Sequence, residues 1–278
     1  MMIDIGNYPE NVRQTVKAFW TGRLSAAEKQ KLKGKLDQGN RGKATGGKNL
    51  DGLSLLLNSL VERNSTGSLD VHLSKSFVTL PGYFRPTKQW DLIVTKNGRL
   101  VAVIELKSIC GPSFGNNVNN RTEEALGSGI DLKTAIREGA FGKGKPPFTG
   151  FIILIEDAKG SNRPVKTTSH HFPTDPEFDG ASYIKRLDLA CDRMMRECLY
   201  SSAAVIVSPD GSGGQFSEVC PETGIKRFLV ALPHASPRRT SLDRLHVGAH
   251  STQTNLTQRR GSQFPLYSTR SIRAMLNP

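Results

Sequence analysis

Two apolar segments joined by an Asn-Gly pair constrain the fold of this chain most strongly. Residues 89–95 and 100–107 are rich in Val, Ile and Leu, and Asn97-Gly98 lies between them. An Asn-Gly pair between two such segments is a strong signal for a tight turn, so the sequence predicts an antiparallel β-hairpin. Three ionisable residues interrupt the apolar pattern of the hairpin: Asp91, Glu105 and Lys107.

The register of this hairpin decides whether the two carboxylates meet. A two-residue turn would pair Asp91 with Ile104 and place the carboxylates on opposite faces. A three-residue loop, with Gly98 left-handed in a bulge, would pair Asp91 with Val103. The second register gives one face with Asp91, Ile93, Val101, Val103, Glu105 and Lys107, and an opposite face with Trp90, Leu92, Val94, Leu100, Ala102, Ile104 and Leu106. Because it leaves one face wholly apolar and gathers every charge on the other, we expect the second register.

Two carboxylates and an ammonium group at one end of a strand pair are better suited to catalysis than to a purely structural role. Carboxylate oxygens are hard ligands of the kind that Mg²⁺ prefers. A cation held by Asp91 and Glu105 would polarise a phosphodiester and lower the pKa of a bound water. Lys107 would position the water and stabilise developing charge. The alternative is an ion pair on an edge strand, worth about 0–1 kcal/mol, but residues 100–106 are too apolar for an edge.

The remaining periodicity predicts an α/β fold with a mixed central β-sheet flanked by helices. Helices are expected at residues 9–33, 50–63 and 182–199 and from near Thr122, strands at 74–80, 151–155 and 203–207, a polar loop at 111–121 and a final hairpin at 216–231. We expect residues 1–232 to form a single domain. Residues 233–278, rich in Arg, Ser and Thr, are expected to be a poorly ordered tail.

The charge of the chain indicates a polyanionic partner. The formal net charge is +13 at pH 7. Basic residues concentrate in residues 23–48 and in the Arg-rich residues 233–278, which hold a single acid, Asp243. Nucleic acid is the natural partner for such a distribution, and a solvated basic surface is the alternative.

Composition also predicts a cytoplasmic protein with no membrane segment. No aliphatic run approaches the roughly 20 residues that a membrane-spanning helix needs, and the N-terminus lacks the pattern of a signal peptide. The four cysteines show no CxxC pairing, which favours reduced thiols over a zinc site or disulfides. These cysteines are Cys110, Cys191, Cys198 and Cys220.

At Asp91, Glu105 and Lys107 the sequence resembles the PD-(D/E)XK nuclease superfamily, whose signature is an Asp on one strand and Glu-x-Lys on the next. Pro86 lies five residues before Asp91, so the literal Pro-Asp pair is absent. Residues 111–128, continuing through 131–132 and 137–141, are similar to the XhoI family of type II restriction endonucleases. This resemblance covers about residues 5–232.

The resemblance implies a homodimer that cuts double-stranded DNA at the palindrome CTCGAG with Mg²⁺. A cognate DNA methyltransferase is implied as a functional partner. Asp91 and Glu105 become metal ligands, and Lys107 becomes the catalytic lysine. Superfamily members often add an acid from the helix before the strands, for which Glu62 is the candidate; an exposed charge at a helix end is the alternative.

The polar segment after the hairpin offers candidates for contact with DNA. Amides and guanidinium groups read adenine and guanine edges in the major groove. Turn-forming and capping asparagines are the alternative. The candidates for DNA binding are Asn116, Asn117, Asn119, Asn120 and Arg121. Glu123 and Glu124, which follow them, are candidates for additional acids near the metal site.

Two other functions fit the same residues. A repair or recombination nuclease of this fold would recognise DNA structure rather than a base sequence. A non-catalytic DNA-binding module would use the ionic cluster only to support the hairpin. The long asparagine-rich segment favours a restriction enzyme over a repair or recombination nuclease.

Deletion of residues 233–278 tests the role expected for the Arg-rich tail. The truncated protein should bind non-cognate DNA more weakly, and its affinity should depend less steeply on salt, because fewer arginine–phosphate contacts release counterions. The measurement is log affinity against log salt concentration for both proteins. The site that is cut should not change, and a truncated chain that fails to fold would contradict the expected domain boundary.

Overall fold

The structure is a computed structural model that describes residues 3–32, 50–65, 69–74, 76–211 and 213–235. These residues belong to one compact unit that spans Met1–Arg238. Most of the basic stretch at residues 23–48, and nearly all of the expected tail at residues 233–278, lie outside the described residues.

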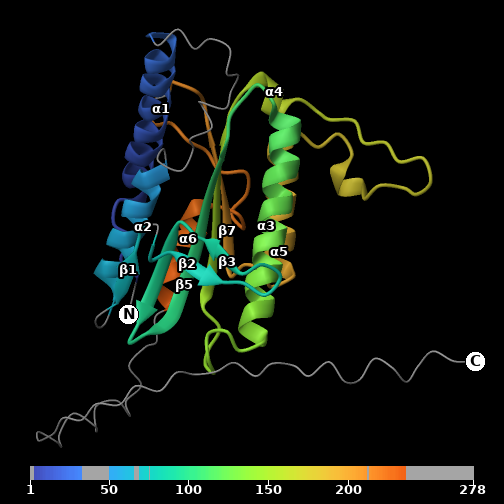
Figure 1. The fold of residues 1–278 in the computed structure, drawn as a ribbon. Helices are drawn as coiled ribbons and strands as arrows, with labels where there is room; N and C mark the ends of the chain where they lie inside the picture. The colour runs from blue at the N-terminus through green and yellow to red at the C-terminus, as the bar shows by residue number, and fades with distance from the viewer. Residues whose placement is uncertain (1–2, 33–49, 66–68, 75, 212, 236–278) are drawn as a thin grey trace, which may run out of the picture. The chain divides into compact units, whose positions relative to one another are not determined.

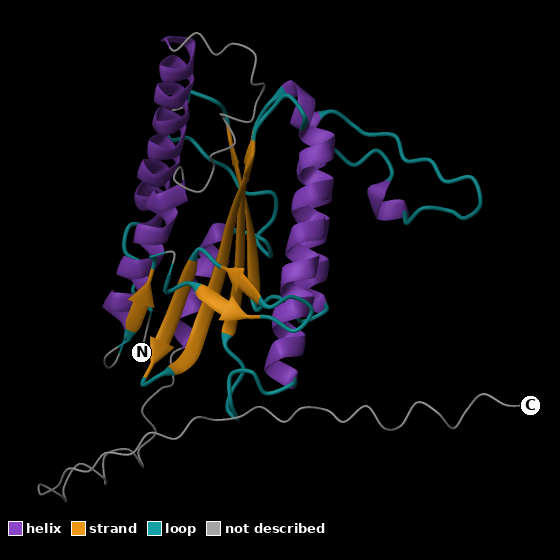
Figure 2. Cartoon of the chain, viewed as in Figure 1, coloured by secondary structure: helices purple, strands orange, loops and turns teal. Residues whose placement is uncertain are grey.

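A five-stranded sheet forms the centre of this unit, in the order β1-β4-β5-β6-β7 (Figures 1 and 2). Its strands are β1 (Asp70–His72), β4 (Leu92–Lys96), β5 (Arg99–Ile109), β6 (Phe148–Glu156) and β7 (Ser202–Ser208). The first two pairings in this order are antiparallel, and the last two are parallel. Since β5 has a neighbour on each side, the prediction that Glu105 and Lys107 do not lie on an edge strand is confirmed.

Helices cover both faces of this sheet (Figure 1). One face packs against α1 (Tyr8–Leu32), α2 (Asp51–Asn64) and α6 (Ile225–Ala231), and the other against α3 (Phe114–Arg137) and α5 (Tyr183–Arg196). The short helical elements are α4 (Lys159–Asn162), η3 (Pro176–Phe178) and η4 (Leu232–Ala235). This arrangement confirms the predicted mixed α/β fold.

Alternating side chains of the central strands build the two cores. Leu92, Ile104 and Ile152 pack with α1 and α2. Phe151 and Ile153, which alternate with Ile152 along β6, pack with α3 and α5 on the opposite face. A strand that is buried on both faces has a nearly continuous run of apolar residues in its sequence, and residues 148–155 form such a run.

A second, two-stranded antiparallel sheet lies beside the main one. It consists of β2 (Thr79–Pro81) and β3 (Thr87–Gln89), and Leu80 pairs with Lys88. The strand expected at residues 74–80 is therefore wrong over most of its length, because residues 76–77 form a turn in which the Phe77 N–H donates to the Ser74 carbonyl. We call β2, β3 and the residues between them the β2–β3 hairpin.

Two predicted elements are wrong over most of their length, because each contains buried apolar residues at helical spacing. Residues 114–121 are not part of a loop: α3 begins at Phe114, before the helix start expected near Thr122, and Phe114, Val118 and Ala125 are buried at helical spacing. Residues 216–231 do not form a hairpin. Ile225, Phe228 and Leu229 are buried on one face of α6.

Membrane segments and disulfides are both lacking in what the structure describes. Among the described residues, no helix combines the length and the apolar character needed to cross a bilayer. None of the four cysteines forms a disulfide bond.

The buried stripe of α2 should be essential for stability. Leu57 is fully buried between α1 and the sheet, whereas Leu55 on the same helix is 58% exposed. Leu57→Ala should lower the free energy of unfolding by about 2–5 kcal/mol, because it leaves a cavity. Leu55→Ala should change it by less than about 0.5 kcal/mol. Urea unfolding followed by circular dichroism measures both, and equal effects would contradict this packing.

Candidate active site

The β4–β5 hairpin turns at Asn97-Gly98, but neither register considered from the sequence is the observed one. Lys96 pairs with Arg99, so the turn has two residues, and both Asn97 (φ 50°) and Gly98 (φ 74°) are left-handed. The register then shifts between Val94 and Thr95. The bulge is therefore inside β5 and not at Gly98, because the Asn-Gly pair already forms an unstrained two-residue turn.

The bulge exchanges the faces of two neighbouring side chains. Thr95 pairs with Leu100 and Val94 with Ala102, which leaves Val101 as the extra residue. Leu100 consequently packs with the cluster of Ile93 and Val103, and Val101 joins the opposite core. The predicted faces of Leu100 and Val101 are thus wrong.

Trp90 also lies on the face opposite to the predicted one. It precedes β4 and packs with Val78, Ile93, Val103 and Leu132. Its N–H donates to the carbonyl of Val78, the residue before β2, instead of joining the β4–β5 ladder.

The same bulge brings the two carboxylates together. Leu92 pairs with Ile104, so Asp91, one residue earlier, stands across from Glu105. The Asp91 N–H donates to the Ile104 carbonyl, and Asp91 Oδ2 accepts the N–H of Leu106 at 2.7 Å. The carboxyl of Asp91 therefore closes the β4–β5 ladder beside Glu105.

Glu105 is a buried carboxylate held by two lysines. Its side chain is 1% exposed, and its Oε1 lies 2.7 Å from Lys107 Nζ and 2.9 Å from Lys88 Nζ. Lys107 was predicted from the sequence, and Lys88 was missed. Lys88 is 17 residues away on β3, and no spacing within the chain points to it. The structure thus joins Asp91, Glu105, Lys107 and Lys88 into one cluster, which we call the acid–lysine cluster.

Helix α3 holds the β2–β3 hairpin in place. The carboxylate of Asp131 accepts the N–H groups of Tyr83 and Phe84 and the Nε–H of Arg85. At the other end of the hairpin, the Lys88 ammonium lies 4.7 Å from the centre of the Trp90 ring, which adds a cation–π attraction. These contacts fix the strand from which Lys88 reaches Glu105.

Burial and charge act differently on the two carboxyls of the cluster. Burial raises the pKa of Asp91, against the hydrogen bond from Leu106 and the attraction of Lys107. Burial would also raise the pKa of Glu105, but the attraction of Lys107 and Lys88 and their hydrogen bonds outweigh it, so that pKa is lowered. Glu105 is therefore the firmly ionised member of the pair.

The cluster fits a divalent cation. Glu105 Oε2 is buried and has no hydrogen-bond partner, because both lysines contact Oε1. A buried carboxylate oxygen without a donor is costly unless something positive reaches it. Asp91 and Glu105 supply only two carboxylates, and no group of three or more possible ligands occurs in the described residues. Mg²⁺ keeps several waters and needs few protein ligands, so two carboxylates suit it.

The additional acids predicted from the sequence are not brought into this cluster. Glu62 is on α2, whose buried residues pack on the sheet face opposite to α3, and it accepts a hydrogen bond from Asn58. Glu123 and Glu124 are exposed on α3, where Glu124 pairs with Arg121. Their involvement in metal binding stays a prediction without a contact to support it.

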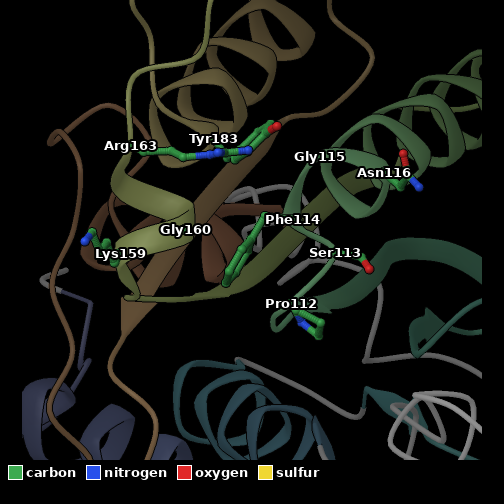
Figure 3. Close-up of a pocket in the computed structure, with 9 residues that line it drawn as sticks. All are labelled: Pro112, Ser113, Phe114, Gly115, Asn116, Lys159, Gly160, Arg163 and Tyr183. Atoms are coloured by element: carbon green, nitrogen blue, oxygen red, sulfur yellow. The ribbon is translucent and has the colours of Figure 1, made fainter.

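The predicted DNA-binding residues lie on the first turns of α3. Asn116, Asn119 and Asn120 are exposed there, and Asn117 and Arg121 are partly buried. Beside Asn116 lies a pocket of about 640 Å³ (Figure 3), lined by Pro112, Ser113, Phe114, Gly115, Asn116, Lys159, Gly160, Arg163 and Tyr183. Figure 3 shows the Phe114 ring between α4 and the start of α3. Lys159 and Arg163 make this pocket basic.

Comparison with known proteins points to one family. The model of the restriction endonuclease XhoI family matches residues 29–218. The type II restriction enzyme XhoI of Xanthomonas vasicola is 45% identical over 196 residues, which cover 70% of this chain and 78% of the relative. AbrI of Azospirillum brasilense is 48% identical over 172 residues (62% and 77%), and BstVI of Geobacillus stearothermophilus is 43% identical over 203 residues (70% and 90%). No solved structure matches the chain.

The raised pKa of Asp91 predicts a conflict between stability and activity. Because the pKa of Asp91 is raised in the folded chain, this carboxyl group contributes stability that is fully present below its ordinary pKa of 3.8. That contribution is lost as the pH rises through the raised pKa. Asp91→Asn keeps an oxygen for the Leu106 N–H but cannot ionise. This variant should be more stable than the wild type at pH 7, with no advantage below pH 3.8, and should not cut DNA. Urea unfolding at several pH values measures this, and a less stable variant at pH 7 would contradict it.

Proposed function

Since the chain belongs to the XhoI restriction endonuclease family and is a type II restriction endonuclease, we propose that it cleaves duplex DNA at CTCGAG with Mg²⁺ as cofactor. Type II restriction enzymes act on double-stranded DNA. The observation that carries the proposed chemistry is the meeting of Asp91, Glu105 and Lys107 beside a central strand. The recognition sequence is supported by the similarity to enzymes named XhoI, AbrI and BstVI.

Each member of the cluster has a role that its surroundings suit. Asp91 and Glu105 would hold the cation, Glu105 through the buried oxygen that the lysines leave open. A bound Mg²⁺ supplies charge stabilisation at the phosphodiester and a more acidic water. Lys107, whose side chain is 23% exposed, can reach solvent from Glu105 and so can position the attacking water.

The start of α3 and the basic pocket beside it are the proposed contact surface for DNA. Exposed amides on one helix can lie in the major groove and read base edges. Lys159 and Arg163, which line the same pocket as Asn116, provide the cations that a phosphate backbone requires. Phosphate contacts position the duplex, whereas Asn116, Asn119 and Asn120 would contribute to its recognition.

The biological setting follows from the proposed activity. A palindromic site is cut symmetrically by a homodimer, since the two-fold symmetry of the protein then matches that of the DNA. A cognate methyltransferase that protects the host site is the functional partner, and the cytoplasm is the place of action. We propose that residues 1–232 form the catalytic domain.

Digestion of a plasmid with one CTCGAG site tests the proposed function. The wild-type protein should linearise the plasmid with Mg²⁺ and should leave it intact with EDTA. Asp91→Ala and Glu105→Ala should each lower the rate by at least about 10³-fold, because each removes a ligand for the cation. Glu222→Ala, at an exposed position outside the cluster, is the matched control.

The DNA products of this digestion distinguish a restriction enzyme from a structure-specific nuclease and from a non-catalytic DNA-binding module. Sequencing of the fragment ends should place the cut within CTCGAG. Nicks at branched or damaged DNA would instead indicate a structure-specific nuclease, and binding without cleavage would indicate a non-catalytic module. Near-normal cutting by Asp91→Ala or Glu105→Ala would remove that residue from the site.

A further inference from the structure

Lys88 is the member of the acid–lysine cluster that the proposed chemistry does not use. Its side chain is 12% exposed, and its ammonium shares Glu105 Oε1 with Lys107. A long side chain loses conformational freedom when it is held in this way. The carboxylate of Asp131 holds the turn of the β2–β3 hairpin, and the Trp90 ring attracts the Lys88 ammonium, so both ends of the hairpin are fixed at the site.

Both lysines of the cluster are more exposed than the carboxylate that they hold. Glu105 is almost completely buried, while Lys107 and Lys88 are 23% and 12% exposed. An approaching anion therefore meets the two lysines before it meets the carboxylate of Glu105. This order suits a phosphodiester, since the carboxylates alone would repel it.

The charges of the cluster balance only when both lysines are counted. In the free protein, the two ammonium groups offset the charges that Asp91 and Glu105 carry when ionised. A divalent cation on the carboxylates would leave a surplus of two positive charges. A phosphodiester carries one negative charge, and attack by hydroxide adds a second, so two lysines match the transition state and one does not.

We propose that Lys88 is a second substrate-contacting lysine, whose ammonium neutralises Glu105 in the free protein and binds the scissile phosphate in the DNA complex. This inference rests on the proposed function and goes beyond the Asp, Glu and Lys of the signature. It requires only a change of partner for Lys88, from Glu105 to the phosphate.

Removal of the charge at residue 88 should move metal binding and cleavage in opposite directions. Lys88→Met keeps an unbranched apolar side chain but removes the ammonium, and with it the cation–π attraction to Trp90. Without the repulsion of the ammonium, the dissociation constant for Mg²⁺ should fall by about three- to tenfold. The rate of cleavage at saturating Mg²⁺ should fall by about 10²-fold, because the phosphate loses a charged donor.

The measurements use the full-length protein and three variants. Calorimetry with Mg²⁺ alone gives the metal affinity, plasmid cleavage gives the rate, and thermal melting shows that each variant is folded. Lys88→Arg retains the charge and should keep the wild-type metal affinity and recover part of the rate. Lys17→Met removes an exposed charge on α1 and should change neither quantity.

The outcomes distinguish the inference from the function on which it rests. Weaker metal binding together with slower cleavage in Lys88→Met would show that Lys88 only holds Glu105 in place. Normal cleavage by this variant would show that Lys88 has no role at the phosphate. Either result would overturn the inference about Lys88 and leave the proposed function standing. Absence of cleavage by the wild type and by Lys17→Met would refute the proposed function, and with it the role of Lys88 at the phosphate.

Discussion

The buried carboxylate of Glu105 is the interaction on which the rest of the site depends. An ionised group at this depth is destabilising unless partners surround it. Two ammonium groups on Oε1 meet that requirement, and they leave Oε2 without a donor. The protein thus keeps an unpaired acceptor in its interior, which is unfavourable for folding and useful for holding a cation. The raised pKa of Asp91 is a second cost of the same kind.

One helix connects the chemistry with the proposed recognition of DNA. The first turns of α3 carry the exposed asparagines, and Asp131, further along the same helix, holds the hairpin that carries Lys88. A rigid element that joins both functions keeps catalytic groups in register with the bound duplex. The exposed asparagines are therefore better understood as one face of a helix than as a mobile loop, which also limits how they can approach a groove.

Part of the site was predictable from the sequence, and the reasons for the failures are specific. Asp91 and Glu105 were expected together, and they are together, but the bulge that achieves this is at Val101 and not at Gly98. A bulge at either position restores the same alternation, so the pattern of apolar residues could not distinguish them. Only the first turns of α3 were expected to be a loop, because their asparagines hid the buried spacing of Phe114 and Val118.

By itself, the sequence determined strands β4 to β7, the turn at Asn97-Gly98 and the three charges that mark the β4–β5 hairpin, because each of these is encoded by neighbours in the chain. Only the tertiary structure decided where β5 shifts register, which oxygen of Glu105 is left open, and that Lys88 completes the cluster. Those features arise from contacts between strands that are distant in sequence, and the periodicity of a single segment carries no information about them.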